Sequence, residues 1–107
     1  MAQSSSPARE SIRGTVPMLA EYADKIIYGE VWERPGLSKR DRSLITCGAL
    51  MAMGRYEQLR GHLERALTNG VTKDEISELI THLAFYSGWP TAMTAARLAK
   101  GVFETRK

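Results

Sequence analysis

Cysteine is almost absent from this 107-residue sequence, which contains one, Cys47. A single thiol forms no disulfide within the chain, and it supplies neither a CxxC redox motif nor a multi-cysteine zinc site. Long apolar runs are absent too, since none approaches the ~20 residues that a membrane-spanning helix needs. The polar first residues lack the apolar core of a secretory signal. We therefore expect a cytoplasmic protein with no membrane partner.

Positive charge exceeds negative charge by only a small amount. The sequence has 15 lysines and arginines against 12 aspartates and glutamates, for a net charge of +3. The basic residues are scattered along the chain, whereas a nucleic-acid-binding surface usually clusters them on one face. Metal-ligand spacings, a glycine-rich phosphate loop, HExxH and GxSxG are all missing. We expect no nucleic-acid partner and no metal site.

Apolar residues recur at helical spacing, and no stretch alternates as a strand does. We predict an all-α protein, a compact bundle of about five helices. The expected helices span about 15–28, 38–53, 56–69, 73–87 and 90–104. The length fits one domain, so we expect residues 13–107 to form the helical domain and the polar residues 1–12 to form a disordered tail.

Cap and turn residues mark the predicted helix ends. Ser38 is a candidate N-cap for the second helix. Gly70 is a candidate left-handed residue after the third helix. Thr72 and Glu75 have the T-x-x-E spacing of a capping box, which predicts that the fourth helix begins there. Pro90 suits the first position of the last helix.

Residues 44–53 are nearly all apolar or small. A helix that is apolar on every side must be buried on every side. We expect so short a chain to leave part of this helix, and several alanines of the last helix, uncovered. These surfaces predict a homo-oligomer.

The sequence has two histidines, His62 and His82. Histidine is the side chain best suited to proton transfer near neutral pH. Each of the two lies in the middle of a predicted helix, at the border of its apolar stripe. The same position suits a half-buried, hydrogen-bonded structural histidine, so position alone leaves both interpretations open.

Three blocks of the sequence resemble the carboxymuconolactone decarboxylase family. Residues 29–37, followed by residues 42–46, are similar to the opening segment of the 4-carboxymuconolactone decarboxylases. Residues 62–76 resemble the family's H-x-x-x-A-L-x-N-G-V-T-x-x-E-I block, and residues 82–92 resemble its H-x-x-x-Y-x-G-x-P-x-A block. The blocks stand in the family's order and at its spacing, over roughly residues 15–103.

The wider family includes the AhpD-like thiol enzymes of peroxidase systems, which carry a CxxC motif shortly before a histidine. In this sequence the two cysteine positions hold Arg55 and Gln58, upstream of His62. Cys47 instead lies inside the apolar helix. We therefore predict that the chain has no thiol peroxidase activity.

The resemblance to the decarboxylase branch implies an AhpD-like helical fold assembled as a hexamer or trimer, with a pocket near a subunit boundary. It implies a cofactor-free carboxy-lyase whose partner is a small carboxylated lactone, 4-carboxymuconolactone or a relative, in protocatechuate catabolism (the β-ketoadipate pathway). Such a lactone takes the electrons released with CO₂ onto its own carbonyl oxygen. Two alternatives stay open: a different lactone or keto acid as substrate, and a non-catalytic helical oligomer.

The implied reaction requires a hold on the spectator carboxylate, a stabilised oxyanion and a proton for the ring carbon. We predict that His62, with an ordinary pKa, is the proton donor, and that His82 is a second acid or an oxyanion donor. Glu30 is predicted to orient a histidine. The candidates for substrate binding are Arg34 and Arg42 as carboxylate clamps, and Trp32, Tyr86 and Trp89 as apolar walls.

Overall fold

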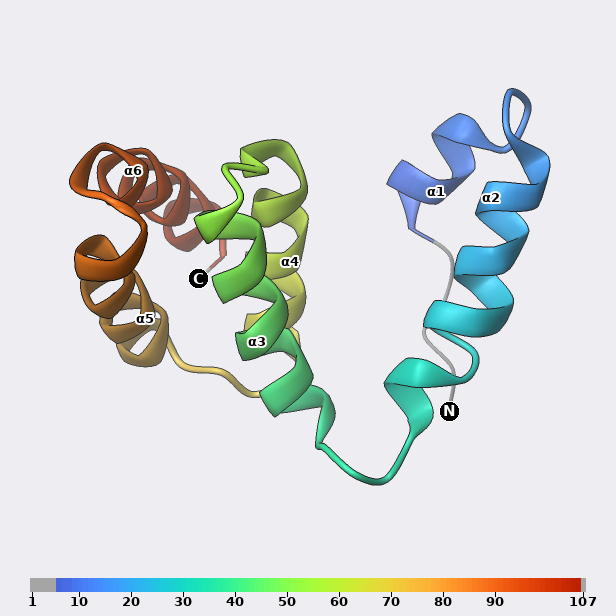
Figure 1. Ribbon diagram of the computed structural model, residues 1–107, viewed down its shortest axis with the longest axis horizontal. Coiled ribbons are helices and arrows are strands. Elements are labelled where there is room, and N and C mark those ends of the chain that lie inside the picture. Colours follow the sequence, from blue (N-terminus) through green and yellow to red (C-terminus); the bar gives the residue numbers. More distant parts are fainter. Residues whose placement is uncertain (1–5, 107) are drawn as a thin grey trace. The chain divides into compact units, whose positions relative to one another are not determined.

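The computed structural model describes residues 6–106, and every regular element within that range is helical (Figure 1). The predicted all-α class is confirmed, with six α-helices and two shorter helical turns in the described residues. Contacts divide these residues into an N-terminal unit that ends at Lys39 and a C-terminal unit that begins at Arg40. We describe each unit by itself. None of the helices between residues 6 and 106 combines the length and hydropathy needed to cross a bilayer.

The N-terminal unit begins with a helix that the sequence analysis did not expect. Helix α1 spans Pro7–Ile12. The Ser6 hydroxyl caps it by accepting from the Arg9 backbone N–H at 3.2 Å, and Pro7 has the fixed φ that suits a first helical position. The expectation of a disordered tail over residues 1–12 is therefore wrong for Pro7–Ile12. Its first five residues lie outside the described residues.

The rest of the N-terminal unit consists of short helical segments that follow one another along the chain. Helix α2 spans Pro17–Tyr22 and continues directly into η1, a π-helix over Ala23–Ile27. The chain then forms η2, a 3₁₀ turn over Val31–Glu33. The helix predicted over 15–28 is thus present, but its second half has wider π turns. Gly29 follows at once, where a Cβ atom would lie 2.5 Å from the Lys25 carbonyl oxygen, so only glycine fits there.

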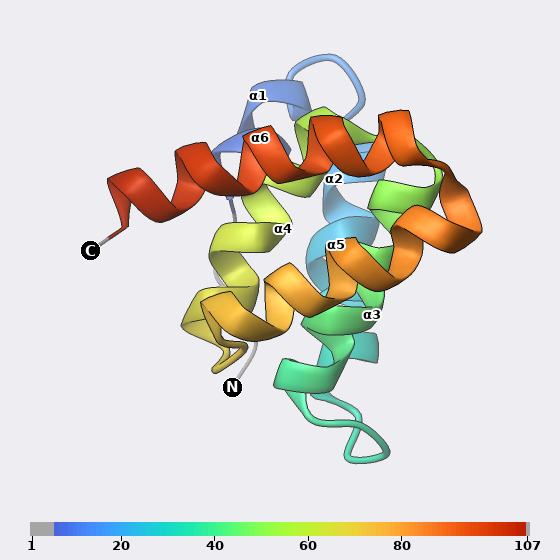
Figure 2. The same ribbon diagram turned by 90° about the vertical axis from the view of Figure 1, so that its left-hand side faces the viewer.

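Four long helices form the C-terminal unit, and their bounds lie close to the predicted ones. They are α3 (Lys39–Ala52), α4 (Tyr56–Thr68), α5 (Lys73–Ser87) and α6 (Trp89–Thr105). Helix α6 packs against both α4 and α5 (Figure 2). The largest fully buried apolar side chains of this core are Met51, Leu59, Leu63, Ile76 and Val102.

Local signals explain why these helices begin and end where they do. The predicted capping box is confirmed: Glu75 N–H donates to Thr72 Oγ1 at 3.0 Å, and Thr72 N–H donates to Glu75 Oε1 at 2.9 Å. Gly70, with φ of +101°, ends the turn after α4, and Gly88, with φ of +107°, separates α5 from α6. Only glycine adopts such angles freely.

Helix α3 is buried on one face rather than all round. Ser43, Cys47 and Met51 are buried, whereas Ile45 and Met53 are 57% and 62% exposed. The chain taken alone thus leaves part of the apolar run uncovered, as the sequence analysis expects. That a second copy covers the exposed residues stays a prediction.

Candidate functional site

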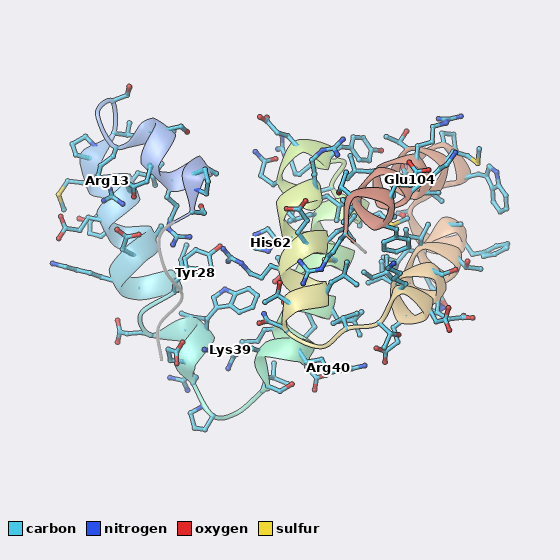
Figure 3. The ribbon with its side chains drawn as sticks, turned by 180° about the vertical axis from the view of Figure 1, so that it is seen from behind. Arg13, Tyr28, Lys39, Arg40, His62 and Glu104 are labelled. Carbon is cyan, nitrogen blue, oxygen red and sulfur yellow. The ribbon has the colours of Figure 1, made fainter. Side chains whose placement is uncertain are left out.

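His62 projects from the middle of α4 (Figure 3). Its residue is half-buried, and its Nδ1 atom lies out of reach of solvent. Burial, and then the positive charge of Arg65, lower the pKa of His62 to about 4. Desolvation acts in this direction because it disfavours the charged imidazolium. His62 is therefore neutral at neutral pH, and the prediction that it has an ordinary pKa is wrong.

Arg65 is a neighbour of His62 that the sequence analysis missed. It follows His62 by three residues on α4, which places both on the same side of the helix. Arg65 is half-buried, and its Nη1 atom is shielded from solvent like His62 Nδ1. A histidine followed by an arginine at this spacing within an amphipathic helix is the signal that points to the pair.

Arg42 lies on α3, in a segment that is tied to the end of α4. The Asn69 side-chain amide donates to the Ser43 hydroxyl at 2.9 Å, and Ser43 is fully buried. Ser43 follows Arg42 directly, and Asn69 lies one turn beyond Arg65. The bond therefore brings the part of α3 that carries Arg42 to the part of α4 that carries Arg65. Arg42 is itself half-buried, with its Nε shielded from solvent.

His82 lies in different surroundings, on α5. It is exposed, and its ring lies 4.9 Å from that of Tyr86, centroid to centroid. It lines a groove of about 520 Å³ between α3 and α5, together with Leu44, Leu79, Leu83, Glu75 and Glu78. His62 is not among the lining residues, so this groove does not unite the two predicted histidines.

The acidic residues of the His82 groove differ in their pairing. Glu75 is engaged in the capping box with Thr72 and in an ion pair with Arg40. The hydrogen bond from the Thr72 backbone and the Arg40 guanidinium lower the pKa of the Glu75 carboxyl. Glu78 adds a second carboxylate to the lining. Like charges repel, so this groove is a poorer place for a carboxylated substrate than the surroundings of His62.

Three predicted site residues belong to the N-terminal unit. Trp32 is buried and stacks on Tyr28, with ring centroids 5.8 Å apart. Glu30 and Arg34 are exposed. Both histidines belong to the C-terminal unit, so the roles given to these three residues toward a histidine or its substrate stay predictions.

Tyr86 and Trp89 stand at the junction of α5 and α6. They are 77% and 61% exposed, and Trp89 makes an edge-to-face contact with Phe85 at 6.1 Å between ring centroids. Within the described chain, their rings therefore face outward. Their role as walls of a substrate pocket stays a prediction that requires cover from another molecule.

Cys47 faces the core of the C-terminal unit. It is 1% exposed, and burial raises the pKa of its thiol to about 12. The thiolate is the nucleophilic form of cysteine, and it is scarce at such a pKa. This environment supports the prediction that the chain is not a thiol peroxidase. In the portion of the chain that the structure covers, no three histidine, cysteine or acidic side chains gather as a metal site would need.

Three known proteins are similar to this chain in sequence. The 4-carboxymuconolactone decarboxylase of Acinetobacter baylyi is 46% identical over 83 residues, which cover 78% of this chain and 62% of the relative. The nitrosuccinic acid decarboxylase npaB of Metarhizium robertsii is 41% identical over 68 residues, 64% of this chain and 48% of the relative. An uncharacterized 15.0 kDa protein of Paracoccus denitrificans is 31% identical over 110 residues, 96% of this chain and 82% of the relative.

The two named decarboxylases are longer than this chain, which spans less than two thirds of the length of either one. The carboxymuconolactone decarboxylase family, compared as a whole, matches residues 17–101. That range includes His62, Arg65 and His82, and it takes in most of both units. With four fifths of the sequence matched, the chain belongs to the carboxymuconolactone decarboxylase family.

Proposed function

We propose that this chain is a carboxy-lyase, which removes CO₂ from a small substrate that carries its own electron sink. The observation that carries the proposal is the similarity to two relatives that are both named decarboxylases. We further propose 4-carboxymuconolactone, an intermediate of protocatechuate breakdown, as the substrate, because the relative named for it has the higher identity of the two. The second relative favours nitrosuccinate as the alternative substrate.

The two named substrates share their chemistry. Each carries two carboxylates and an electron-withdrawing group, a conjugated lactone carbonyl in one and a nitro group in the other. When CO₂ leaves, the electron pair of the broken C–C bond moves onto an oxygen of that group, which yields a dienolate or a nitronate. A proton then adds to carbon. Because the substrate accepts the electrons itself, we propose that the reaction needs no metal or organic cofactor.

His62 is proposed to serve this reaction in two ways. Its neutral ring has one N–H donor, which stabilises the oxygen on which negative charge develops. A bound dianion beside the ring favours the imidazolium form and raises its pKa. His62 therefore takes up a proton from solvent when the substrate binds. It then delivers that proton to the substrate carbon in the complex. Arg42 is proposed to help hold the carboxylate. The oxyanion-donor role of His82 stays a prediction because its groove does not include His62, and so does the clamp role of Arg34, which belongs to the N-terminal unit.

The proposed assembly is a homo-oligomer in the cytoplasm, a hexamer or a trimer. Large apolar side chains on the surface of the C-terminal unit support it, because monomeric proteins rarely expose such groups together. They are Ile45, Met53, Phe85, Tyr86 and Trp89. Light scattering at micromolar concentration tests this: a mass several times that of one 107-residue chain is expected, and a monomer contradicts it.

The activity is tested with the purified chain and both candidate substrates. We expect CO₂ release and loss of the lactone absorbance with 4-carboxymuconolactone, at a rate well above that of the buffer. A faster rate with nitrosuccinate would identify nitrosuccinate as the better substrate and would leave the proposed decarboxylation unchanged. A folded oligomer that releases CO₂ from neither compound would favour the non-catalytic alternative.

A further inference from the structure

Two nitrogen-rich side chains lie together in the second half of α4. His62 and Arg65 occupy the same side of the helix, one turn apart. Both are half-buried, and His62 Nδ1 and Arg65 Nη1 are shielded from solvent. The charge of Arg65 reaches the His62 ring and opposes its protonation. This part of α4 is therefore electropositive and partly removed from water, which strengthens its attraction for an anion.

Helix α3 adds to this charge. The Ser43–Asn69 hydrogen bond holds the segment of α3 that carries Arg42 beside the last turn of α4. Arg42 thus brings a further guanidinium group toward this side of α4. Arg106, at the end of α6, donates to the Glu64 carbonyl at 3.3 Å and to the Thr68 hydroxyl at 2.8 Å, and so lies on a different side of α4 from His62.

We propose that Arg65 is a specificity-determining residue, which pairs with the carboxylate that the substrate keeps and so makes the site selective for dicarboxylates. This inference rests on the proposed function, in which the other carboxylate leaves as CO₂. The planar guanidinium binds a carboxylate through two parallel hydrogen bonds, which fixes the orientation of the substrate as well as its position. The bound carboxylate also offsets the repulsion between Arg65 and a protonated His62.

The same reasoning separates the two histidines. A dicarboxylate beside His62 meets Arg65, whereas one in the groove of His82 meets Glu78 and a Glu75 that is already paired with Arg40. Electrostatics therefore assigns the dicarboxylate to α4. This assignment is testable without any turnover, because the sequence has only these two histidines and each gives its own NMR signals.

The experiment titrates the full chain with succinate while the ring signals of both histidines are followed by NMR. We expect succinate to move the signals of His62 and to raise its apparent pKa, with those of His82 unchanged. Acetate, which has one carboxylate, is expected to bind at least tenfold more weakly. Succinate that moves only His82, or moves neither ring, would overturn the proposal.

Variants on one helix make the test specific to Arg65. Arg65→Gln is expected to weaken succinate binding by about 10- to 100-fold, since a hydrogen-bonded charge pair is lost. Arg65→Lys keeps the charge without the planar fork, so an intermediate loss of several-fold is expected. Arg60→Gln is the matched control, because Arg60 is exposed on the opposite side of α4 and should leave binding unchanged.

Circular dichroism and melting temperature establish first that each variant is folded. If Arg65→Gln fails to fold, Arg65→Lys carries the test, and wild-type succinate affinity in Arg65→Lys then overturns the proposal. Wild-type affinity in a folded Arg65→Gln does the same. Succinate has no electron sink and is not decarboxylated, so its binding is independent of turnover. Selective succinate binding by a chain that decarboxylates nothing would support this inference and contradict the proposed function.

Discussion

The two units of the chain are held together by different kinds of interaction. In the C-terminal unit, the helices close over a contiguous apolar core that includes Met51, Leu63 and Val102. Among the described residues of the N-terminal unit, the buried apolar ones are Ala20 and Trp32. That unit instead carries a charged cluster in which Asp24 pairs with Arg9 at 2.9 Å and with Arg13 at 2.8 Å.

This difference teaches where each unit is sensitive. Apolar burial contributes to stability at any pH and over a wide range of salt. Ion pairs near the surface contribute less, and both salt and acid weaken them. Arg9 also lies over the Tyr28 ring at 4.2 Å, which adds a cation–π contact to the same cluster. The C-terminal unit should therefore respond to changes in packing, and the N-terminal unit to changes in charge.

The largest effect is expected on catalysis. His62→Gln keeps much of the polarity of the side chain but removes the titrating proton, so kcat should fall about 10²- to 10⁴-fold if His62 is the acid. Glu30→Gln, in the N-terminal unit, should cost about tenfold at most, because Glu30 is proposed only to orient a histidine. Steady-state kinetics with helix content as control would measure both. A folded His62→Gln with wild-type turnover would remove His62 from the mechanism.

The next effect concerns stability. Leu63→Ala leaves a cavity in the core of the C-terminal unit and should lower the free energy of unfolding by about 2–5 kcal/mol. Leu19→Ala removes the same atoms from a side chain that is 61% exposed on α2, and its cost should be within about 0.5 kcal/mol. Urea unfolding at matched protein concentration compares them. Equal losses would mean that Leu19 is covered in solution.

Helix caps give a smaller test of the same contrast. Thr72→Ala removes half of the capping box of α5 and should cost about 1 kcal/mol of global stability. Ser6→Ala removes the cap of the six-residue helix α1, and we expect it to increase hydrogen exchange in α1 without lowering the global unfolding free energy. If Ser6→Ala lowered global stability as much as Thr72→Ala, the two units would unfold together.

The smallest effect is local and depends on pH. The hydrogen bond from Arg13, and that from Arg9, lower the pKa of the Asp24 carboxyl below its usual range. A carboxyl whose pKa is lower in the folded state stabilises fully above its unfolded pKa of about 4. That stabilisation is lost as the pH falls through the lower folded value. Amide protection factors in α1 and α2, taken relative to the intrinsic exchange rate at each pH, should thus fall on acidification, and Asp24→Asn should abolish most of this dependence.

The helices of the C-terminal unit were predictable because their signals are local. The capping box at Thr72 and the glycines at 70 and 88 mark ends that the structure confirms within one or two residues. Helix α1 was missed because its main tie, from Arg9 to Asp24, spans 15 residues and leaves no periodic pattern. The π turns of η1 also lack a sequence signal, apart from the glycine that follows them.

The candidate site was predictable in part. The family resemblance singled out His62 and His82 as candidates, but nothing in the sequence indicates how deeply each ring is buried. The lowered pKa of His62 therefore came from the structure. Arg65 was missed because it belongs to no motif and becomes a candidate only through its position one turn from His62. The outward positions of Tyr86 and Trp89 depend on the tertiary arrangement, which composition does not reveal.

The burial of Cys47 has a practical consequence. Because this cysteine is unique in the sequence and closed off inside the C-terminal unit, a thiol-reactive dye should leave the native chain unlabelled. Labelling then requires that the helices around Cys47 separate. The labelling rate therefore reports how often the C-terminal unit opens, and no engineered probe is needed. Opening confined to the N-terminal helices would not expose Cys47 to the dye. Comparing the labelling rate with hydrogen exchange in those helices therefore shows which unit opens more often.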